Sequence, residues 1–577
     1  MSIKVLPFQR RRGQIVFYLM IPLFLILIIS LFKIQIVKGS HYKEIAMAQH
    51  LCHIPIPGIR GKILARNKEI LAISLNMYSV GVDPGMITSP QEVTQKLSGI
   101  LSTSPGELRD RLSYKGCKFI WLERKVSDSV ARQIRKLNIK GIYLIKEETG
   151  KRFYPNEKLA CHIMGYTGID DQGLDGIESI YENYLAGKPG LLKAECDNFG
   201  RAVPMGKQEI QPATDGCDVV LTIDKFIQYL AESELRKAVE RHKARGGSIV
   251  VMDPQTGEIL AIANYPDFDV NQYNTTPKNK LRNSGVCDSY EPGSTFKVIL
   301  AAAALDSGKI TMDDVFPSGN SIQIGGWTIF NANDGLASEF GYENVKDIIK
   351  YSFNTGSASI GMKMGKKTYC DYIKKFGFGA VTGIELPGEG EGIVVDPNDW
   401  SVSSLATIAF GQGISITPLQ LVRAVSAIAN GGKLFKPMIV KEILSPEGNV
   451  VKSFSPQVEA QILKPETTEK MRTILEEVVS DGTGKKAQVP GYTVAGKTGT
   501  AQVVENGIYS PSSYIGSFVG YVPSRNPRLV MLVKIDVPKG IYWGGTVAAP
   551  VFREVAREAL WHMGVPSEKE LEKKSNN

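Results

Sequence analysis

Histidine is scarce in this sequence and is absent from its whole C-terminal half up to residue 561. The six histidines lie at positions 41, 50, 53, 162, 242 and 562. A Ser-His-Asp triad drawn from residues 243–561 is therefore impossible. No H-E-x-x-H or comparable cluster occurs anywhere, which excludes the common histidine-rich metal sites. A serine nucleophile in this region would need another base, and lysine is the usual substitute.

Cysteine is also sparse and shows no functional spacing. The seven cysteines lie at positions 52, 117, 161, 196, 217, 287 and 370. An odd number of scattered cysteines without a C-x-x-C pair predicts neither a disulfide framework nor a zinc knuckle. We expect most of them to be buried thiols.

The sequence has no internal repeats, no low-complexity tract and no basic run interleaved with aromatic residues. Its net charge of +9 is modest for 577 residues and is spread along the chain, which argues against a nucleic-acid partner. With 43% hydrophobic and 22% charged residues, the composition is that of an ordinary folded protein. The length exceeds what one hydrophobic core usually holds, so two or more domains are expected.

One long hydrophobic run stands near the N-terminus, from Ile15 to Phe32. At about 1.5 Å per residue it spans about 27 Å, close to the hydrocarbon thickness of a bilayer. Lys4 and the arginines at 10–12 precede it, and Lys33 follows it. This charge pattern predicts a single-pass anchor in the cytoplasmic membrane, with the N-terminus inside and the chain after Lys33 on the external, periplasmic side.

A cleaved signal peptide is the alternative interpretation of this run. Ala46-Met47-Ala48 resembles a processing site. It lies far beyond the apolar core, however, and that core is long for a signal sequence. We therefore expect a retained anchor.

The pattern of the chain changes at Gly246. Before it, short strand-like runs such as 78–82, 143–145 and 219–222 alternate with amphipathic helices such as 225–243, and no chemistry is obvious. After it, residues 246–266 read as two strands joined by a turn, followed by a helical region rich in alanine and leucine. Three more strands are expected at 492–504, 513–522 and 529–537, and a helix at 550–563. Strands at both ends of a helical region predict an α+β fold, an antiparallel sheet covered by helices, with catalytic groups between the sheet and a helical lobe.

These patterns divide the chain into five parts. They are a cytoplasmic basic arm at 1–14, a transmembrane helix at 15–32, a mixed α/β pedestal domain at 33–245, a catalytic domain at 246–563 and a polar tail at 564–577.

The segment YEPGSTFKVILAAAALDSGK contains a serine and a lysine in an S-x-x-K pattern, at Ser294 and Lys297. Pro292 and Gly293 turn the chain, and the apolar residues that follow predict a buried helix. On a helix the two side chains share a face and lie within reach. A lysine ammonium cannot accept a proton, so burial and nearby positive charge must favour its neutral form before it can act as a base.

S-x-x-K alone is a weak signal, because Ser30 and Lys33 also match it at the membrane boundary. S-x-N is weaker still and occurs several times, one instance being Ser352-Phe353-Asn354. The order of the motifs along the chain and their flanking residues must decide which S-x-x-K and S-x-N matches are functional.

The third motif, VAGKTGTAQ, is less common and lies on a predicted strand. It contains Lys497, Thr498, Gly499 and Thr500. The lysine and the two hydroxyls can hold a substrate carboxylate, the glycine leaves room for the backbone of a ligand, and the Thr500 N–H can complete an oxyanion hole. The alternative interpretation is an edge-strand lysine beside a glycine bulge.

Together the motifs S-x-x-K, S-x-N and K-T-G stand in the order of the penicillin-recognising serine enzymes. Residues 247–555 resemble the transpeptidase domain of class B penicillin-binding proteins throughout. The words that carry this resemblance are YEPGSTFK, SFNTG, FGQGISITPLQL (410–421), DGTGKKA (481–487), PGYTVAGKTGTAQ and SFVGYVP (517–523). Upstream, IRGKILARNKEILA (59–72), RFYP (152–155) and GLDGIE (173–178) are similar to pedestal motifs of that family, although Ala65 stands where aspartate is usual.

The resemblance implies a peptidoglycan D,D-transpeptidase, a serine-type acyl transferase of the D-Ala-D-Ala carboxypeptidase class, which needs no metal or organic cofactor. Ser294, deprotonated by Lys297, would attack the penultimate D-Ala carbonyl of a stem peptide, and an amine of a neighbouring stem peptide would deacylate the enzyme. Ser352 and Asn354 would relay the leaving-group proton and orient Lys297 and the substrate amide. The substrate-binding residues would be Lys497, Thr498, Gly499 and Thr500. β-Lactams would acylate Ser294.

Two other classes of function are compatible with some of the same sequence features. A D,D-carboxypeptidase or a β-lactamase-type hydrolase has the same three motifs and differs in whether water or an amine deacylates it. A non-enzymatic scaffold would keep the anchor and pedestal but would take up no covalent penicillin label. The large pedestal and retained anchor favour cross-linking at the membrane.

Within the family, EPGS before the serine, asparagine at 354 and GYTVAGKTGTA resemble the cell-division branch more than the elongation branch. This resemblance implies septal wall synthesis, with the septal glycosyltransferase and other divisome membrane proteins as partners.

Overall fold

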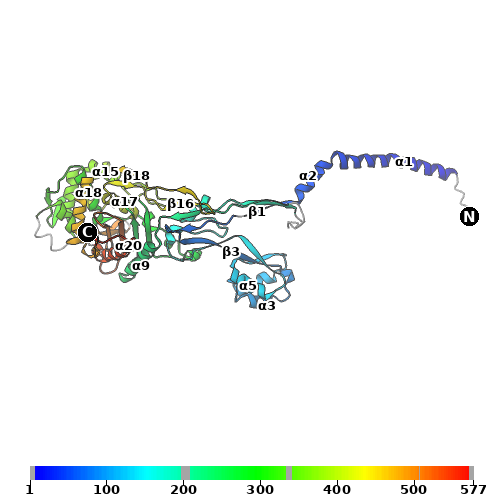
Figure 1. The fold of residues 1–577 in the computed structure, drawn as a ribbon, viewed down its shortest axis with the longest axis horizontal. Coiled ribbons are helices and arrows are strands. Elements are labelled where there is room, and N and C mark those ends of the chain that lie inside the picture. Colours follow the sequence, from blue (N-terminus) through cyan, green and yellow to red (C-terminus); the bar gives the residue numbers. More distant parts are fainter. Residues whose placement is uncertain are drawn as a thin grey trace. The chain divides into compact units, whose positions relative to one another are not determined.

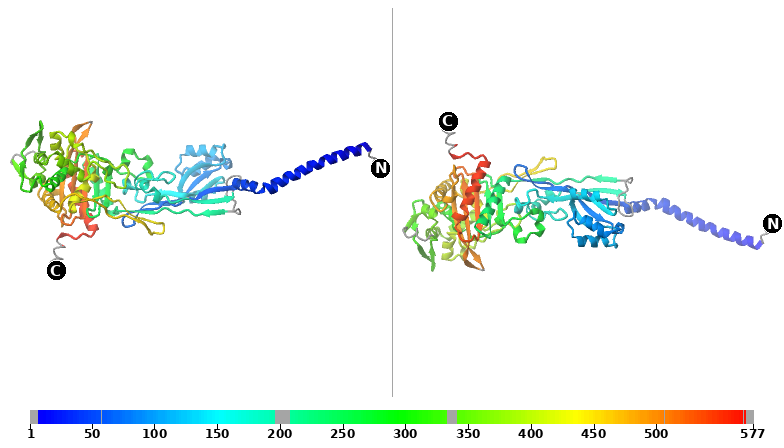
Figure 2. Two further views of the ribbon diagram at one scale, coloured as in Figure 1. Left: turned by 90° about the horizontal axis from the view of Figure 1, so that it is seen from above. Right: turned by 90° about the horizontal axis from the view of Figure 1, so that it is seen from below.

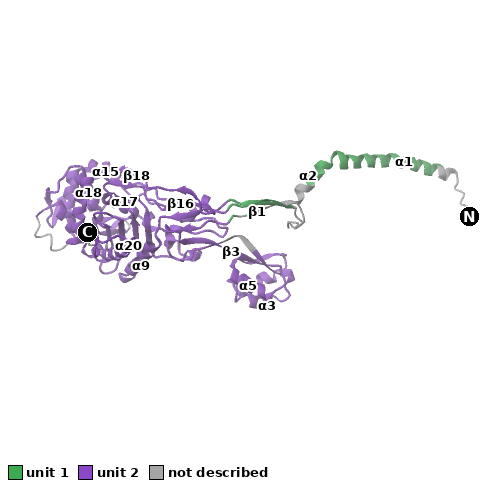
Figure 3. Cartoon of the chain, viewed as in Figure 1, with its two compact units in different colours: residues 1–58, 188–214 green, residues 59–187, 215–577 purple. Residues whose placement is uncertain are grey.

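The computed structural model describes residues 7–56, 58–195, 208–332, 341–505, 507–568 and 570. Its contacts divide the chain into two units, residues 1–58 with 188–214 and residues 59–187 with 215–577 (Figure 3). Each unit is therefore built from two segments that are distant in the sequence.

The first unit contains the apolar N-terminal helix and a small sheet. Helix α1 (Pro7–Phe32) continues through the π-helical segment η1 (Lys33–Val37), and α2 (Gly39–His50) follows. The helical stretch that is long and apolar enough to cross a membrane runs from Arg11 to Val37. It contains the predicted run and extends four residues before it and five after it, where Ile34, Ile36 and Val37 continue the exposed apolar surface. Strands β1 (Leu51–Ile56), β6 (Gly190–Glu195) and β7 (Gln208–Gln211) form an antiparallel sheet in the order β1-β6-β7.

The larger sheet of the second unit draws strands from both halves of the sequence. Its order is β17-β16-β8-β2-β3-β4, and β5 also pairs with β3. The bounds are β2 (Ile63–Leu64), β3 (Ile70–Val82), β4 (Ile120–Ser127), β5 (Ile142–Phe153), β8 (Asp218–Leu221), β16 (Val440–Leu444) and β17 (Val450–Ser453). The strand-like runs in the N-terminal half fall on β3, β5 and β8. No sequence pattern indicated that β16 pairs with β8, an antiparallel contact between residues about 220 positions apart.

A small helical layer covers one face of the strands β3, β4 and β5. Its helices are α3 (Pro90–Leu97), α4 (Pro105–Ser113) and α5 (Asp128–Leu137). Leu97, Leu108 and Ile134 from the helices pack with Val80 and Leu122 from the strands. In the three views this layer lies at the end of the second unit opposite the five-stranded sheet described below (Figures 1 and 2).

A buried charge network joins residues from the three sequence segments that resemble pedestal motifs. Arg60 Nε donates to Glu178 Oε2 at 2.8 Å, and Arg152 Nε donates to Glu178 Oε1 at 2.6 Å. The Tyr154 hydroxyl donates to the same oxygen at 3.2 Å. All four side chains are buried, so each charge depends on its partners for compensation. At the unusual position Ala65 the side chain packs in the core while its N–H donates to Glu69 O at 2.9 Å.

The second sheet of this unit has the order β10-β9-β21-β20-β19 and is antiparallel throughout. The bounds are β9 (Gly246–Met252), β10 (Ile259–Tyr265), β19 (Ala495–Glu505), β20 (Ile508–Val522) and β21 (Leu529–Asp536). Every predicted strand of the C-terminal half is present with shifted ends. The α+β prediction is confirmed.

Helices cover both faces of the five-stranded sheet. On one face lie α9 (Lys225–Arg241) and α20 (Ala549–His562), which share a core with the sheet. The other face packs against the helical lobe. The main helices of the lobe and its connections are α11 (Ser284–Cys287), η4 (Gly293–Phe296), α12 (Lys297–Asp306), α13 (Val345–Tyr351), α14 (Asn354–Met364), α15 (Lys366–Lys375), α16 (Val402–Ile408), α17 (Pro418–Ala429) and α18 (Pro465–Ser480). The short helix α19 (Gly544–Val547) precedes α20, and its Val547 belongs to the core that α9 and α20 share with the sheet. The strand β19 is an edge strand next to this lobe.

The buried network predicts a large stability effect at Glu178. Replacement by alanine leaves Arg60 and Arg152 buried without their shared carboxylate, which should lower the free energy of unfolding by about 3–5 kcal/mol. Urea titration of the detergent-solubilised protein measures this change. Asp128→Ala is the control, because its ion pair with Arg132 is exposed and should contribute at most about 1 kcal/mol. Equal losses in the two variants would contradict a stabilising role for the network.

Candidate active site

Ser294 lies on a tight turn between the five-stranded sheet and the helical lobe. Gly293 has a φ of 55°, and its N–H donates to Gly411 O at 3.0 Å. Ser294 falls in the short 3-10 helix η4, and the α-helix α12 begins at Lys297. The sequence predicted that Ser294 and Lys297 would share a face of one helix. The tighter turn still serves the pair, because residues three apart in a 3-10 helix eclipse one another.

Lys297 is completely buried and points toward the S-x-N motif. Its Nζ lies 2.7 Å from Ser352 O, 3.2 Å from Ser352 Oγ and 2.7 Å from Asn354 Oδ1. Ser352 closes α13 in the left-handed conformation, with a φ of 65°, and Asn354 opens α14. A neutral amine has two N–H donors and one lone pair. Ser352 O and Asn354 Oδ1 can accept both N–H groups of Lys297. The lone pair of Nζ is then left to accept a proton from a serine hydroxyl.

The environment of Lys297 favours this neutral form. Burial lowers the pKa of Lys297 well below its ordinary value, and the positive charge of Lys497 lowers it further. These are the two effects that a lysine base requires.

Asn331 holds the S-x-N motif from outside and was not recognised in the sequence. Its Oδ1 accepts hydrogen bonds from Asn354 N at 2.7 Å and from Thr355 N at 3.1 Å. Its Nδ2 donates to Gly319 O at 2.9 Å. Asn331 thus satisfies the free N–H groups at the start of α14 and fixes the position of Asn354. A single asparagine more than twenty residues upstream carries no sequence signal for this role.

The K-T-G residues divide between the site and the core behind it. Lys497 is completely buried, and its Nζ lies 3.2 Å from Thr498 O and 3.4 Å from Thr498 Oγ1. Burial lowers its pKa to about 7. Thr498 Oγ1 lies 2.8 Å from Thr483 Oγ1, and Thr500 Oγ1 accepts a hydrogen bond from Gly544 N at 3.3 Å. The hydroxyls of Thr498 and Thr500 therefore line the site, and Lys497 contacts Thr498 from behind.

Gly499 does not provide the space for a ligand that the sequence suggested. A Cβ atom there would lie 2.4 Å from Ser517 Oγ and 2.8 Å from Thr295 Cγ2. Thr295 is the neighbour of Ser294. The missing side chain therefore lets β19 approach the nucleophile turn of its own chain.

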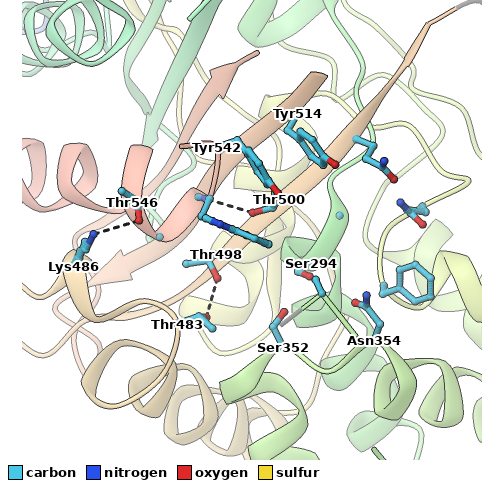
Figure 4. A pocket seen from close by; sticks show the side chains of 18 of the residues that line it. Ser294, Ser352, Asn354, Thr483, Lys486, Thr498, Thr500, Tyr514, Tyr542 and Thr546 are labelled. Carbon is cyan, nitrogen blue, oxygen red and sulfur yellow. Dashed lines mark hydrogen bonds between the residues drawn. The ribbon is translucent and has the colours of Figure 1, made fainter. Parts of the chain in front are cut away.

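These elements enclose a cavity of about 590 Å³ (Figure 4). Of the predicted site residues, Ser294, Ser352, Asn354, Thr498 and Thr500 line it, while Lys297, Lys497 and Gly499 lie behind its surface. The remaining lining residues are Gly293, Ala332, Phe410, Gln412, Thr483, Lys485, Lys486, Gln502, Tyr514, Tyr542, Trp543, Gly544, Gly545 and Thr546.

Two groups of these lining residues were missed as site residues. Tyr514 and Tyr542 stack with ring centroids 4.1 Å apart, and Trp543 lies 4.9 Å from Tyr542. They had no sequence signal. Phe410 and Thr483, by contrast, lie in the words FGQGISITPLQL and DGTGKKA that carried the family resemblance. Those words could have identified them.

Comparison with known proteins agrees with this geometry. The penicillin-binding protein transpeptidase domain matches residues 247–557, more than half of the chain, and the penicillin-binding protein dimerisation domain matches residues 55–221. The chain belongs to the class B penicillin-binding proteins. It is a serine-type peptidoglycan D,D-transpeptidase by family.

Relatives of this penicillin-binding protein extend along almost the whole chain. It is 37% identical to stage V sporulation protein D of Bacillus subtilis, over 98% of this chain and 88% of that protein. It is 31% identical to the peptidoglycan D,D-transpeptidase FtsI of Escherichia coli K12, over 88% of this chain and 84% of that protein.

Solved structures of the family share the fold. Penicillin-binding protein 2X of Streptococcus thermophilus matches with a TM-score of 0.74 and 26% identity, over 90% of this chain and 82% of that one. Penicillin-binding protein 3 of Mycobacterium tuberculosis, in complex with aztreonam, matches with a TM-score of 0.69 and 29% identity, over 89% and 98%.

No cluster of three or more His, Cys, Asp or Glu side chains suited to a metal ion occurs among the described residues.

The buried Lys497 predicts a pH dependence of stability. In the folded protein Lys497 loses its proton near pH 7, whereas an unfolded lysine keeps it up to about pH 10.4. Between these values the unfolded chain binds one more proton, so this lysine makes the free energy of unfolding rise with pH by about 1.4 kcal/mol per unit. Lys497→Met should remove this rise between about pH 8 and 10, as measured by urea titrations at several pH values.

The exposed Lys309→Met is the control for that measurement. An unchanged slope in Lys497→Met would show that Lys497 keeps its proton in the folded protein. An equal reduction of the slope in both variants would show that the rise does not come from Lys497.

Proposed function

We propose that this protein cross-links peptidoglycan stem peptides through an acyl-enzyme on Ser294. The observation that carries the proposal is the position of Lys297, which is buried three residues after Ser294 and whose Nζ contacts oxygens of Ser352 and Asn354. Its lowered pKa suits a general base. Family membership supports the same chemistry.

In the acylation step, Lys297 takes the proton of the Ser294 hydroxyl as Oγ attacks the penultimate D-Ala carbonyl. The N–H groups of Ser294 and Thr500 stabilise the developing oxyanion. The C–N bond to the terminal D-Ala breaks, and the proton passes through Ser352 to the leaving amine. Asn354 orients the substrate amide and Lys297.

The substrate carboxylate binds at the hydroxyls of Thr498 and Thr500, which line the cavity. Lys497 acts from behind by contacting Thr498. Gly499 contributes indirectly by letting β19 pack against the nucleophile turn. An amine from a second stem peptide then attacks the acyl carbon and releases Ser294.

The chain organisation supports work at the membrane. We assign residues 15–32 to a single-pass anchor, 33–245 to a pedestal and 246–563 to the transpeptidase domain, with the short arm before the anchor inside the cell and the tail after residue 563 outside. The apolar helix and the two family matches support this assignment. The arginine cluster at 10–12 supports an external catalytic domain.

β-Lactams should acylate Ser294, because a strained amide beside a carboxylate mimics the D-Ala-D-Ala end of the substrate. We expect one covalent benzylpenicillin adduct on the peptide that contains Ser294, detected by mass spectrometry of the digested full-length protein.

Lys297→Ala should slow acylation by about 10²- to 10⁴-fold, since it removes the general base. Lys309→Ala is the control.

An adduct on another serine, or the absence of one, would contradict the nucleophile assignment and would favour a scaffold. Near-normal acylation of Lys297→Ala would point to a different base. Release of free peptide rather than a cross-linked product, in the presence of an acceptor amine, would favour the hydrolase alternative.

Within the cell we propose a role in septal wall synthesis, with the septal glycosyltransferase and other divisome membrane proteins as partners. The resemblance of EPGS, Asn354 and GYTVAGKTGTA to the division branch supports this, and so does similarity to FtsI over most of the chain. A second candidate is wall synthesis in sporulation. The 37% identity to a protein named for stage V of sporulation, over 98% of this chain, favours it.

Depletion separates these roles. For a septal enzyme we expect a fluorescent fusion to concentrate at midcell, and depletion to give filaments that elongate but do not divide. Expression of the Ser294→Ala variant should fail to restore division, whereas the unchanged protein should restore it. Lateral localisation with rounded, dividing cells would place the enzyme in elongation. Normal vegetative division with failed sporulation would assign it to the spore wall.

A further inference from the structure

The face of strands β3, β4 and β5 that the helical layer leaves open carries a row of aromatic side chains. Gly81 of β3 lies opposite Trp121 of β4 and opposite Tyr143 of β5, and directly opposed residues share one face of a sheet. The Phe119 ring lies over Gly81, where a Cβ atom would be 2.3 Å from it. Its centroid is 4.8 Å from that of Trp121. Phe119, Trp121 and Tyr143 are 41%, 37% and 43% exposed, so the row is open to solvent.

Three lysines stand at one end of the same strands. Both β4 and β5 are antiparallel to β3, and both begin opposite Val82. The segments 114–119 and 138–141, which precede them, therefore meet at this end of the sheet. These segments carry three exposed lysines, Lys115, Lys118 and Lys140. None of the three pairs with a carboxylate among the residues that the structure describes.

The carboxylates around this end do not neutralise the lysines. Asp83 accepts a hydrogen bond from Gly85 N at 2.9 Å, and Glu123 accepts one from Ser102 N at 2.7 Å. Asp110 lies on α4, in the helical layer that covers the opposite face. The end of the strands that carries the lysines is therefore positively charged.

This end is also where the chain enters the second unit from the first. Strand β2 is antiparallel to β3 and parallel to β8. Ile59 and Asp215, the first residues of the two segments that enter the unit, precede β2 and β8, and Ile59 N donates to Asp215 Oδ1 at 2.8 Å. Both therefore lie toward the end of the larger sheet at which β3 finishes. The first unit, from which they come, contains the apolar helix of Arg11–Val37.

The three lysines and the three aromatic side chains form one surface, the basic aromatic end. We infer that it docks on a bilayer of anionic phospholipids, the membrane that holds the apolar helix. Tryptophan and tyrosine favour the boundary between water and lipid, and lysines attract anionic head groups. Because the helix already keeps the chain at the membrane, a contact too weak to bind a free protein still forms at a high effective concentration. The contact restrains the pedestal at a second point besides the helix.

Trp121 provides the probe for this contact, because none of the five tryptophans lies in the apolar helix. Full-length protein is reconstituted in vesicles of phosphatidylcholine, with or without phosphatidylglycerol, whose acyl chains carry bromine. Bromine quenches tryptophan fluorescence at short range, and unbrominated vesicles of the same composition give the reference. We expect quenching in the vesicles with phosphatidylglycerol, and Trp121→Phe should remove most of it.

Two matched sets of lysine substitutions test the role of charge. The combined Lys115→Gln, Lys118→Gln and Lys140→Gln variant should lower the ratio of docked to undocked protein by about 5-fold per lysine. The control removes the same charge from three exposed lysines of the catalytic half, Lys278, Lys309 and Lys433, by substitution with glutamine. It should keep the quenching. Both variants should still be acylated by benzylpenicillin at the rate of the unchanged protein, which shows that they are folded.

Four results would overturn the inference. They are no quenching in vesicles with phosphatidylglycerol, quenching that Trp121→Phe leaves unchanged, equal quenching by brominated phosphatidylcholine alone, and an equal loss of quenching in the two lysine variants. A surface that binds a protein instead of lipid would give the first of these results. The outcome does not depend on acylation at Ser294, so the proposed function stands or falls separately.

Discussion

The chemistry of this protein depends on one buried amine. Lys297 has no exposed surface, and its Nζ contacts three oxygens of the S-x-N motif. Burying a charged lysine is costly, so the neutral amine is favoured, and a second buried lysine nearby strengthens that preference. A base is thus obtained in a region of the chain without histidine.

Three other positions, Ser352, Asn331 and Gly499, fix the geometry around that amine. Ser352 adopts a left-handed conformation that directs its carbonyl oxygen toward Lys297, a conformation that non-glycine residues rarely adopt. Asn331 fixes the start of α14 and with it Asn354. Gly499 lets β19 pack closely against the turn of Ser294. Asn331 and Gly499 contribute to the site through geometry, without themselves being reactive groups.

The second unit shows how distant segments hold this arrangement. Strands β16 and β17 leave the helical lobe and complete the larger sheet beside β8. The Arg60, Arg152 and Glu178 network links β5, which carries Arg152, to the segment before β2 and to the helix at 176–180. The larger sheet is therefore completed by strands that follow the nucleophile turn in the sequence.

The sequence by itself determined the elements whose signals are local. The membrane helix, the five strands of the catalytic sheet and the family motifs follow from periodicity, hydrophobicity and short words, because each depends on residues close together in the chain. The tertiary structure decided the rest. It placed Lys497 behind Thr498, turned Gly499 toward Thr295, and brought Asn331, Tyr542 and Lys486 to the cavity. Those positions result from contacts between residues tens to hundreds of positions apart, and nothing in the neighbouring sequence encodes which surfaces will meet.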